Sequence, residues 1–203
     1  MKRFVLGLGC VLAMMPGVAS AALSVSISPD ITVTKGAIPT TEQFVDLIFN
    51  ETAPTANEGL FAYDLYVIRD KPGITLQRIE KPSDNWVFTS PGASFQQADI
   101  SVPPGLLVAN AIGDLLGANQ DIVGGTKAAR VFYTIDQNAA EGVYHISLDP
   151  TPGTTLFVSG DTGEAIPVDI TSDVGVITVV PEPASLSLLG IAGILALRRR
   201  RSA

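Results

Sequence analysis

The chain has 203 residues, a length that suits one domain together with targeting segments. Six of its 13 Lys and Arg lie in the two end segments, and 19 of its 20 Asp and Glu lie between them, so the middle has seven cations and a net charge of −12. A domain this acidic repels phosphate backbones, which excludes nucleic acid as an expected partner. The acidity fits a soluble extracellular domain, with divalent-cation binding as an alternative.

Residues 1–21 have the organisation of a signal peptide. A short cationic start precedes an apolar stretch of 12 residues at 4–15, and Ala19 and Ala21 flank a serine in an A-x-A cleavage site. The apolar stretch is shorter than the ~20 residues that span a bilayer as a helix. We therefore predict export, with signal peptidase cleaving after Ala21.

The only cysteine, Cys10, lies inside that apolar stretch. After cleavage the mature chain has no thiol, which excludes disulfides and a cysteine nucleophile. A lipid-modified Cys10 is the alternative, and Gly7 disfavours it because lipoprotein signals usually carry an aliphatic residue three places before the cysteine.

Apolar and polar residues alternate over most of the mature chain, a pattern typical of half-buried strands. Turn sequences rich in Pro, Gly and Asp separate the alternating segments. The expected strands cover residues 23–27, 45–49, 61–68, 74–79, 131–135, 144–148, 166–170 and 174–179. About eight or nine short strands with this spacing predict an all-β fold, an antiparallel β-sandwich formed by residues 22–179.

The segment 99–125 departs from this alternation. The apolar spacing of residues 106–116 is compatible with a short helix, but Pro103, Pro104 and several glycines interrupt it. We expect a long connection here that includes a short helix or strand.

Residues 180–203 form a second targeting segment. A Pro-Glu-Pro motif precedes 14 uncharged residues at 184–197, and four arginines follow. The members of the motif and of the arginine cluster are Pro181, Glu182, Pro183, Arg198, Arg199, Arg200 and Arg201. A helix of this length spans ~21 Å, less than the ~30 Å hydrocarbon core, while the arginines resist translocation. The segment therefore suits a transient hold in the inner membrane, with a plain tail anchor as the alternative.

The order of these three elements resembles the PEP-CTERM sorting signal of exopolysaccharide-producing Gram-negative bacteria. The resemblance implies recognition by an exosortase, a membrane cysteine protease, and cleavage near the Pro-Glu-Pro motif. It also implies release to the cell surface or into the extracellular polymer matrix.

The middle of the chain resembles cohesin domains. The resemblance rests on the opening SISP at residues 26–29, on the stretches 60–65 and 129–135, and on the ending at 163–168. It implies a nine-stranded jelly-roll sandwich, related to carbohydrate-binding modules, that docks proteins. The sequence RDKP at 69–72 stands where cohesins usually have Tyr-Asp-Pro, so dockerin binding in particular is not expected.

Residues that could carry catalysis or bind metal are sparse. His145 is the only histidine, and it falls on the outward side of its strand. A zinc site built from several His or Cys is therefore excluded in the mature chain. The sequence also has no Gly-x-Ser-x-Gly elbow for a nucleophilic serine. A carboxylate pair could still serve glycoside hydrolysis. The candidate acids are Asp64, Asp99, Asp114 and Asp121.

Two local features have alternative interpretations. The sequence DTGE at 161–164 resembles the start of a calcium loop but lacks the later ligands, so we expect a hairpin turn. Trp86 with Phe88, and Tyr66, could form an aromatic platform for sugars, although packing is the commoner role of such rings.

Together these features predict an exported, non-enzymatic surface or matrix protein that is sorted by an exosortase. We expect its sandwich to contact a surface protein or extracellular polysaccharide, with no catalytic, cofactor-binding or metal-binding residues. The alternatives are an extracellular glycoside hydrolase and a calcium-dependent adhesion module.

Overall fold

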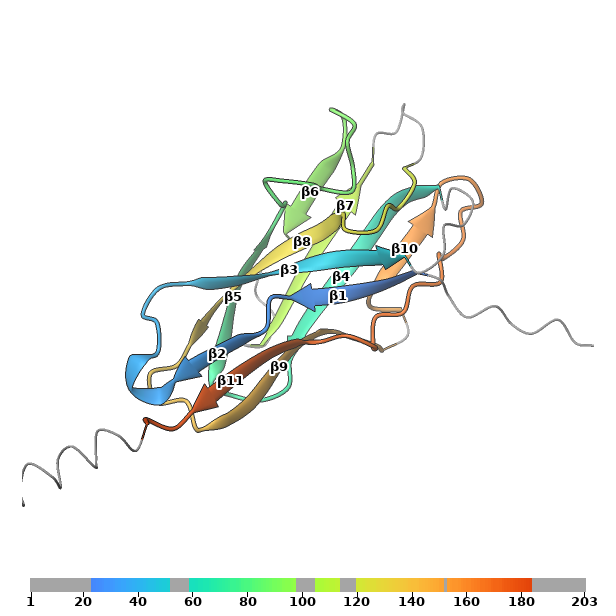
Figure 1. Ribbon diagram of the computed structural model, residues 1–203. Coiled ribbons are helices and arrows are strands. Elements are labelled where there is room, and N and C mark those ends of the chain that lie inside the picture. Colours follow the sequence, from blue (N-terminus) through green and yellow to red (C-terminus); the bar gives the residue numbers. More distant parts are fainter. Residues whose placement is uncertain (1–22, 52–58, 98–104, 114–119, 152, 184–203) are drawn as a thin grey trace, which may run out of the picture.

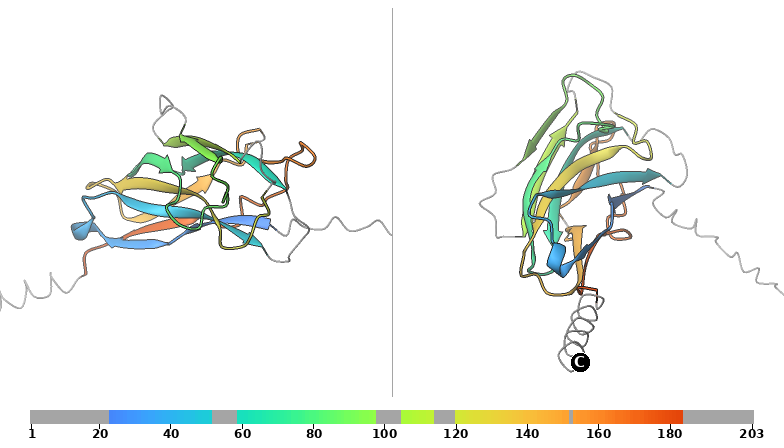
Figure 2. Two further views of the ribbon diagram at one scale, coloured as in Figure 1. Left: turned by 90° about the horizontal axis from the view of Figure 1, so that it is seen from above. Right: turned by 60° about the vertical axis from the view of Figure 1, so that its left-hand side comes forward.

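Two β-sheets pack face to face in this computed structural model, which describes residues 23–51, 59–97, 105–113, 120–151 and 153–183. In Figure 1 strands β1, β3 and β8 lie toward the viewer, with β4 and β7 behind them, and Figure 2 shows the two layers from other directions. The only helical element of the described residues is a three-residue 3-10 helix. The predicted all-β sandwich is confirmed.

The smaller sheet has four strands in the order β1-β3-β8-β5, all antiparallel. Its strands are β1 (Leu23–Ser28), β3 (Gln43–Glu51), β8 (Lys127–Ile135) and β5 (Ile74–Glu80). On the inward side of β3, Val45, Leu47 and Phe49 are fully buried, as the alternation predicts. Burial of each such side chain contributes about 1.5–3 kcal/mol.

The larger sheet has seven strands in the order β2-β11-β9-β4-β7-β6, and β10 also pairs with β4. Its strands are β2 (Ile31–Thr34), β11 (Gly175–Val180), β9 (Gly142–Leu148), β4 (Leu60–Arg69), β7 (Leu106–Ile112), β6 (Ser94–Gln97) and β10 (Leu156–Ser159). The β2–β11 pair is parallel and the other pairs are antiparallel. Because β1 and β2 are consecutive but belong to different sheets, the start of the chain joins the two layers.

The prediction of a strand at residues 166–170 is wrong. The segment forms a single isolated bridge, between Asp169 and Ser24, in place of a continuous ladder. Pro167 has no N–H to donate, and the carboxylate of Asp169 accepts a hydrogen bond from the N–H of Thr171 at 2.9 Å, which turns the chain. The described residues contain eleven strands, more than the eight or nine expected, because β2, β6 and β10 have only four residues each.

The expected connection at 99–125 contains β7, so a strand replaces the alternative of a short helix. The predicted signal peptide, with Ala19 and Ala21, and the predicted tail helix at 184–197 lie outside the described residues. No helix among the described residues is long and apolar enough to cross a membrane.

Candidate functional site

The outward side of the seven-stranded sheet is rich in apolar residues. Alternation along β4 and β7 turns Tyr66 and Ile68 outward beside Val108 and Leu106, and the register places Tyr66 opposite Val108 and Ile68 opposite Leu106. Directly opposed side chains in antiparallel strands are in contact distance, about 4.5–5.5 Å between Cβ atoms. These four residues therefore form one continuous apolar surface.

A second apolar group lies further along the same strands. Ala62 of β4 pairs with Ile112 of β7 on one side and with Val158 of β10 on the other. Leu156 lies two residues before Val158 on β10 and therefore on the same side of the sheet. Ile112 and Leu156 are 39% and 37% exposed, high values for such large apolar side chains. The sheet therefore presents two apolar groups to its outward side.

Asp64 and Asn110 separate the two groups, since they are opposite each other in the register. Asp64 is exposed and Leu156 of β10 lies opposite it on the other side. We call the whole surface the outer apolar face. Its residues are Ala62, Asp64, Tyr66, Ile68, Leu106, Val108, Asn110, Ile112, Leu156 and Val158.

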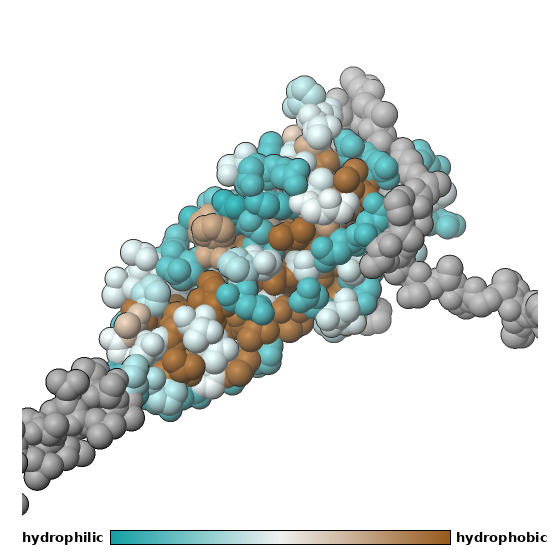
Figure 3. Space-filling model, viewed as in Figure 1, coloured by the Kyte–Doolittle hydropathy of each residue, from teal (hydrophilic) through white to brown (hydrophobic). Residues whose placement is uncertain are grey.

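The outward side of the four-stranded sheet is different in character. Figure 3 shows this side, where hydrophilic and apolar residues are interspersed. Phe44 and Phe132 contact each other with ring centroids 6.0 Å apart, and each ring also packs against a guanidinium group. Arg130 lies 4.2 Å from the Phe44 centroid and Arg78 lies 3.8 Å from the Phe132 centroid. Because a guanidinium group covers a face of each ring, Phe44 and Phe132 are poor platforms for stacking a sugar.

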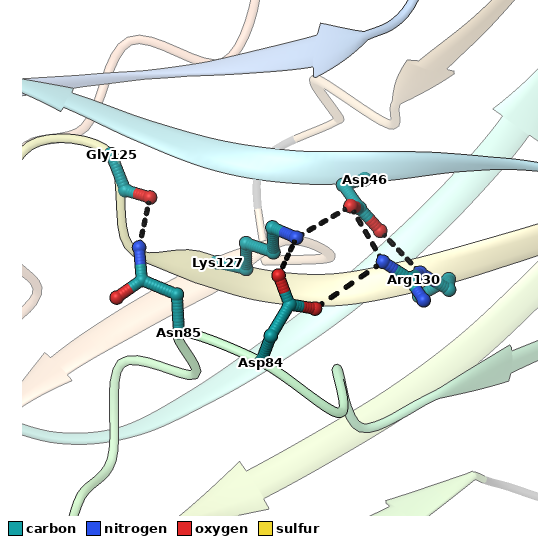
Figure 4. Close-up of polar contacts among 6 residues, drawn as sticks. All are labelled: Asp46, Asp84, Asn85, Gly125, Lys127 and Arg130. Carbon is teal, nitrogen blue, oxygen red and sulfur yellow. Dashed lines mark hydrogen bonds and ion pairs between the residues drawn. The ribbon is translucent and has the colours of Figure 1, made fainter.

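A cluster of charges lies beside these rings (Figure 4). Asp46 of β3 is 7% exposed and accepts two hydrogen bonds from Arg130, at 2.6 and 2.9 Å, while Lys127 lies 2.9 Å away. Asp84 pairs with Lys127 at 2.7 Å. Burial by itself would raise the pKa of Asp46, but the hydrogen bonds from Arg130 and Lys127 outweigh it and lower the pKa. Each acid of the cluster is thus held ionised by a cation, which suits a structural clamp.

The loop that carries Asp84 is held to β8 through the next residue. Asn85 has a left-handed backbone, with φ of 51°, and its side-chain amide donates to the carbonyl of Gly125 at 2.6 Å. The N–H of Lys127 donates to the carbonyl of Asn85 at 2.8 Å. Sequence reasoning did not identify this cluster. The outward position of Asp46 on an apolar strand was the available signal, but its partners are distant in sequence.

His145 lies on the outward side of β9, as predicted, opposite Val176. Its Nδ1 is 2.8 Å from Asp70, and its N–H donates to the same carboxylate at 3.0 Å. Burial would raise the pKa of Asp70, but the hydrogen bonds from His145 lower it. The pair connects the turn after β4 to β9, and this structural role accounts for His145.

The candidate acids are not gathered into one site by what the structure describes. Asp64 lies on the outer apolar face, and Asp121 follows the Gln120 bridge to Leu60. Asp99 and Asp114 lie outside the described residues. The described residues contain no group of three His, Cys, Asp or Glu side chains placed to hold a metal ion.

The segment at 161–164 is a turn, as expected. The N–H of Ser159 donates to the carbonyl of Glu164 at 2.9 Å, and the N–H of Gly163 donates back to Ser159 at 2.8 Å. Trp86 does not form a sugar platform: it is 8% exposed, its Nε1 donates to Tyr63 at 2.9 Å, and its ring packs against Phe88. Packing, the commoner role expected for this ring, is the one it has.

The Pro-Glu-Pro motif continues directly from β11. Pro181, Glu182 and Pro183 are all exposed, whereas Val179 is 2% exposed within the sheet. The four arginines, Arg198, Arg199, Arg200 and Arg201, lie outside the described residues.

Residues 179–201 match the family model of the PEP-CTERM protein-sorting motif. The motif indicates an exported protein that is processed at the membrane. No curated protein matches the chain.

Several solved structures with a similar architecture are cohesins. The sixth cohesin of scaffoldin B from Acetivibrio cellulolyticus, solved in complex with a dockerin, has 18% identity and a TM-score of 0.57, and the match covers 78% of this chain and 99% of that one. The sandwich has a cohesin-like fold. The seventh ScaB type I cohesin from Pseudobacteroides cellulosolvens has 18% identity and a TM-score of 0.55, with 79% and 94% covered.

The third ScaB cohesin of R. flavefaciens, in complex with a group 1 dockerin, also has this cohesin-like fold. Its identity is 18% and its TM-score 0.56, with 82% of this chain and 99% of that chain covered. At these identities the likeness establishes the fold alone.

Proposed function

We propose that this protein is sorted by an exosortase to the cell surface or extracellular matrix of a Gram-negative bacterium, where it acts as a non-enzymatic docking module for a protein. Three observations support the proposal. Residues 179–201 match the sorting motif, the fold is that of domains solved in complex with dockerins, and the outer apolar face has the character of an interface. The proposed docking function rests mainly on the outer apolar face.

Contiguous apolar surface on a soluble domain is costly to leave in water and is typical of interaction sites. The outer apolar face has two apolar groups with Asp64 and Asn110 between them. A protein interface usually has an apolar core and a polar rim, and the polar and charged groups determine the register of the partners. The partner is therefore expected to present apolar side chains around a hydrogen-bond donor that meets Asp64.

Polysaccharide binding is the weaker alternative. Sugars bind to aromatic rings and to polar side chains, and Tyr66 is the one aromatic residue of the outer apolar face. Aliphatic residues such as Ile68 and Val108 make up most of this surface. They match apolar protein side chains better than hydroxyl groups.

The test places a photo-crosslinking amino acid at position 68 or 48 of the full chain in the producing bacterium. Ile68 lies on the outer apolar face, and Ile48 lies on the outward side of β3 in the other sheet. We expect a discrete protein adduct from position 68 alone. Equal adducts from both positions, or none, would count against docking through this face.

Matched substitutions complete the test. Ile68→Asp is expected to abolish the adduct formed from a second photo-crosslinker at position 108, whereas Ile48→Asp is expected to leave it unchanged. Both variants must retain the wild-type circular dichroism spectrum. Co-sedimentation of the purified protein with extracellular polysaccharide, unaffected by Ile68→Asp, would support the alternative, and turnover of a glycan would overturn the non-enzymatic proposal.

Sorting has its own test. Replacement of Pro181, Glu182 and Pro183 by Ala is expected to leave precursor in the inner membrane, and intact-mass measurement of released wild-type protein is expected to show loss of the four arginines. Released protein that retains the arginines would refute cleavage by an exosortase.

A further inference from the structure

The sorting motif has no spacer between it and the folded domain. The motif match begins at residue 179, yet Val179 and Val180 belong to β11. Val179 pairs with Gly142 of β9 and with Val33 of β2, so the strand is held on both sides. Pro181 has no N–H and ends the ladder. The first exposed residue of the match is therefore also the first residue past the sheet.

A short helical turn leaves the sheet beside the motif. Because β2 and β11 are parallel, with Thr34 opposite Val180, the chain continues from both strands in the same direction. After β2 it forms the 3-10 helix η1 (Lys35–Ala37), and after β11 it forms the Pro-Glu-Pro motif. Figures 1 and 2 show η1 at the end of the sandwich at which β11 ends.

Gly36 and Glu182 are in close contact at this end. A Cβ atom built on Gly36 would lie only 2.8 Å from Cδ of Glu182, so any other residue at position 36 displaces the carboxylate. The backbone of Gly36 is not among the left-handed positions, so its conformation does not require glycine. The space that Gly36 leaves is the space that Glu182 occupies.

The contact places Glu182 beside η1 without hiding the motif, because Pro181, Glu182 and Pro183 remain exposed. We propose that η1 and the motif form one composite surface that the processing enzyme recognises. The enzyme meets Glu182 where it lies beside Gly36 and contacts Lys35–Ala37 of the folded domain at the same time. This inference rests on the proposed sorting by an exosortase.

The composite surface exists only in a folded chain. β2 and β11 are far apart in sequence, and the N–H of Val176 donates to the carboxylate of Asp30 at 3.0 Å across 146 residues. Both ends of the domain must pair before η1 and Glu182 meet. Processing is therefore efficient only after the sandwich has formed, which releases folded protein in preference to unfolded precursor.

The experiment follows conversion of precursor to mature protein by pulse-chase in the producing bacterium, with the full chain. One variant carries a six-residue Gly/Ser insertion between Val180 and Pro181, and a second carries Gly36→Val. The control carries the same insertion between Asp161 and Thr162, in an exposed turn at the other end of the sandwich. We expect the first two to be processed at least five-fold more slowly than the wild type, and the control at the wild-type rate.

The double variant, with Gly36→Val and the insertion after Val180, separates this proposal from a general loss of stability. Since the insertion already removes Glu182 from Gly36, the substitution is expected to add no further delay, whereas independent defects would multiply. Processing of both single variants at or above the wild-type rate would overturn the composite surface. Normal processing of the triple Ala variant at residues 181–183 would instead overturn the proposed sorting itself.

Discussion

Arg130 and Asp46 are opposite each other on β8 and β3, and Nε and one terminal nitrogen of the guanidinium donate to the two oxygens of one carboxylate, at 2.6 and 2.9 Å. The side chains of Asp46 and Arg130 are only 10% and 19% exposed. A two-bond pair with this little solvent is stronger than an ordinary surface ion pair, because water screens it less and competes less for its hydrogen bonds.

Asp46→Asn is therefore expected to lower the free energy of unfolding by about 2 kcal/mol, since Arg130 and Lys127 lose their shared carboxylate. Urea unfolding monitored by circular dichroism measures the change. Glu42→Gln is the matched control: Glu42 pairs with Arg78 but is 40% exposed, so we expect a change within about 0.5 kcal/mol. Equal losses in the two variants would contradict the ranking by burial.

The same cluster gives the domain an acid sensitivity. Hydrogen bonds from its cations lower the pKa of Asp46 below its ordinary value of 3.8, despite burial, and the bond from Lys127 lowers that of Asp84. A carboxylate with a depressed pKa in the folded state stabilises the fold above its unfolded pKa, and this contribution is lost as the pH falls through the folded value.

We accordingly expect the free energy of unfolding to decrease below about pH 4. In Asp46→Asn this decrease is smaller, because one of the responsible groups no longer titrates. Urea unfolding curves at pH 7, 5 and 3 provide the measurement. A decrease of the same size in the variant and the wild type would exclude Asp46 as a source of the acid sensitivity.

Two buried tyrosines differ in their hydrogen bonding, so removal of each hydroxyl is expected to change stability in a different direction. The hydroxyl of Tyr63 donates to the carbonyl of Ala128 at 2.5 Å and accepts from Trp86, whereas the buried hydroxyl of Tyr133 has no hydrogen-bond partner among the described residues. Burial raises the pKa of both groups, so both stay neutral. An unpaired buried hydroxyl costs free energy, while a paired one contributes about 1 kcal/mol.

Tyr63→Phe is therefore expected to lower the free energy of unfolding by about 1–2 kcal/mol, since it leaves two partners unsatisfied. Tyr133→Phe is expected to leave it unchanged or raise it by up to about 1 kcal/mol. Thermal unfolding of the two variants in parallel measures both. If Tyr133→Phe were the more damaging of the two, the hydroxyl of Tyr133 would have to make a bond that the structure lacks.

Sequence alternation predicted the strands whose two sides differ in polarity. In β1 and β9 the inward residues are apolar and the outward ones mostly polar, so the period of two is visible. β7 has apolar residues on both sides, because its outward side belongs to the outer apolar face. The pattern of residues 106–112 therefore did not distinguish a strand from a helix, and the ambiguity came from the surface that is now the candidate docking site.

The site itself was less accessible to sequence reasoning. The Pro-Glu-Pro motif is local and was found from its residue order, whereas the contact of Glu182 with Gly36 joins residues near opposite ends of the domain's sequence. The Asp46–Arg130 pair spans 84 residues, and alternation gives the side of a strand but not its neighbour. Strand order decides both contacts, and that order follows from packing of the whole core.

The last prediction concerns Gly73, in the turn between β4 and β5. Its φ is +116°, and an added Cβ would lie 2.6 Å from Cε1 of Tyr144. Tyr144 is 2% exposed and its hydroxyl donates to the carbonyl of Ala140 at 2.6 Å, so the ring cannot move aside cheaply. Gly73→Ala therefore combines backbone strain with a clash, and we expect it to lower the free energy of unfolding by about 2–3 kcal/mol.

Gly125→Ala is the control, because Gly125 has φ of +86° but nothing within 4 Å of its added Cβ, and only the strain of about 1 kcal/mol remains. Urea unfolding of both variants tests the difference, and equal losses would mean that Tyr144 yields to the new methyl group.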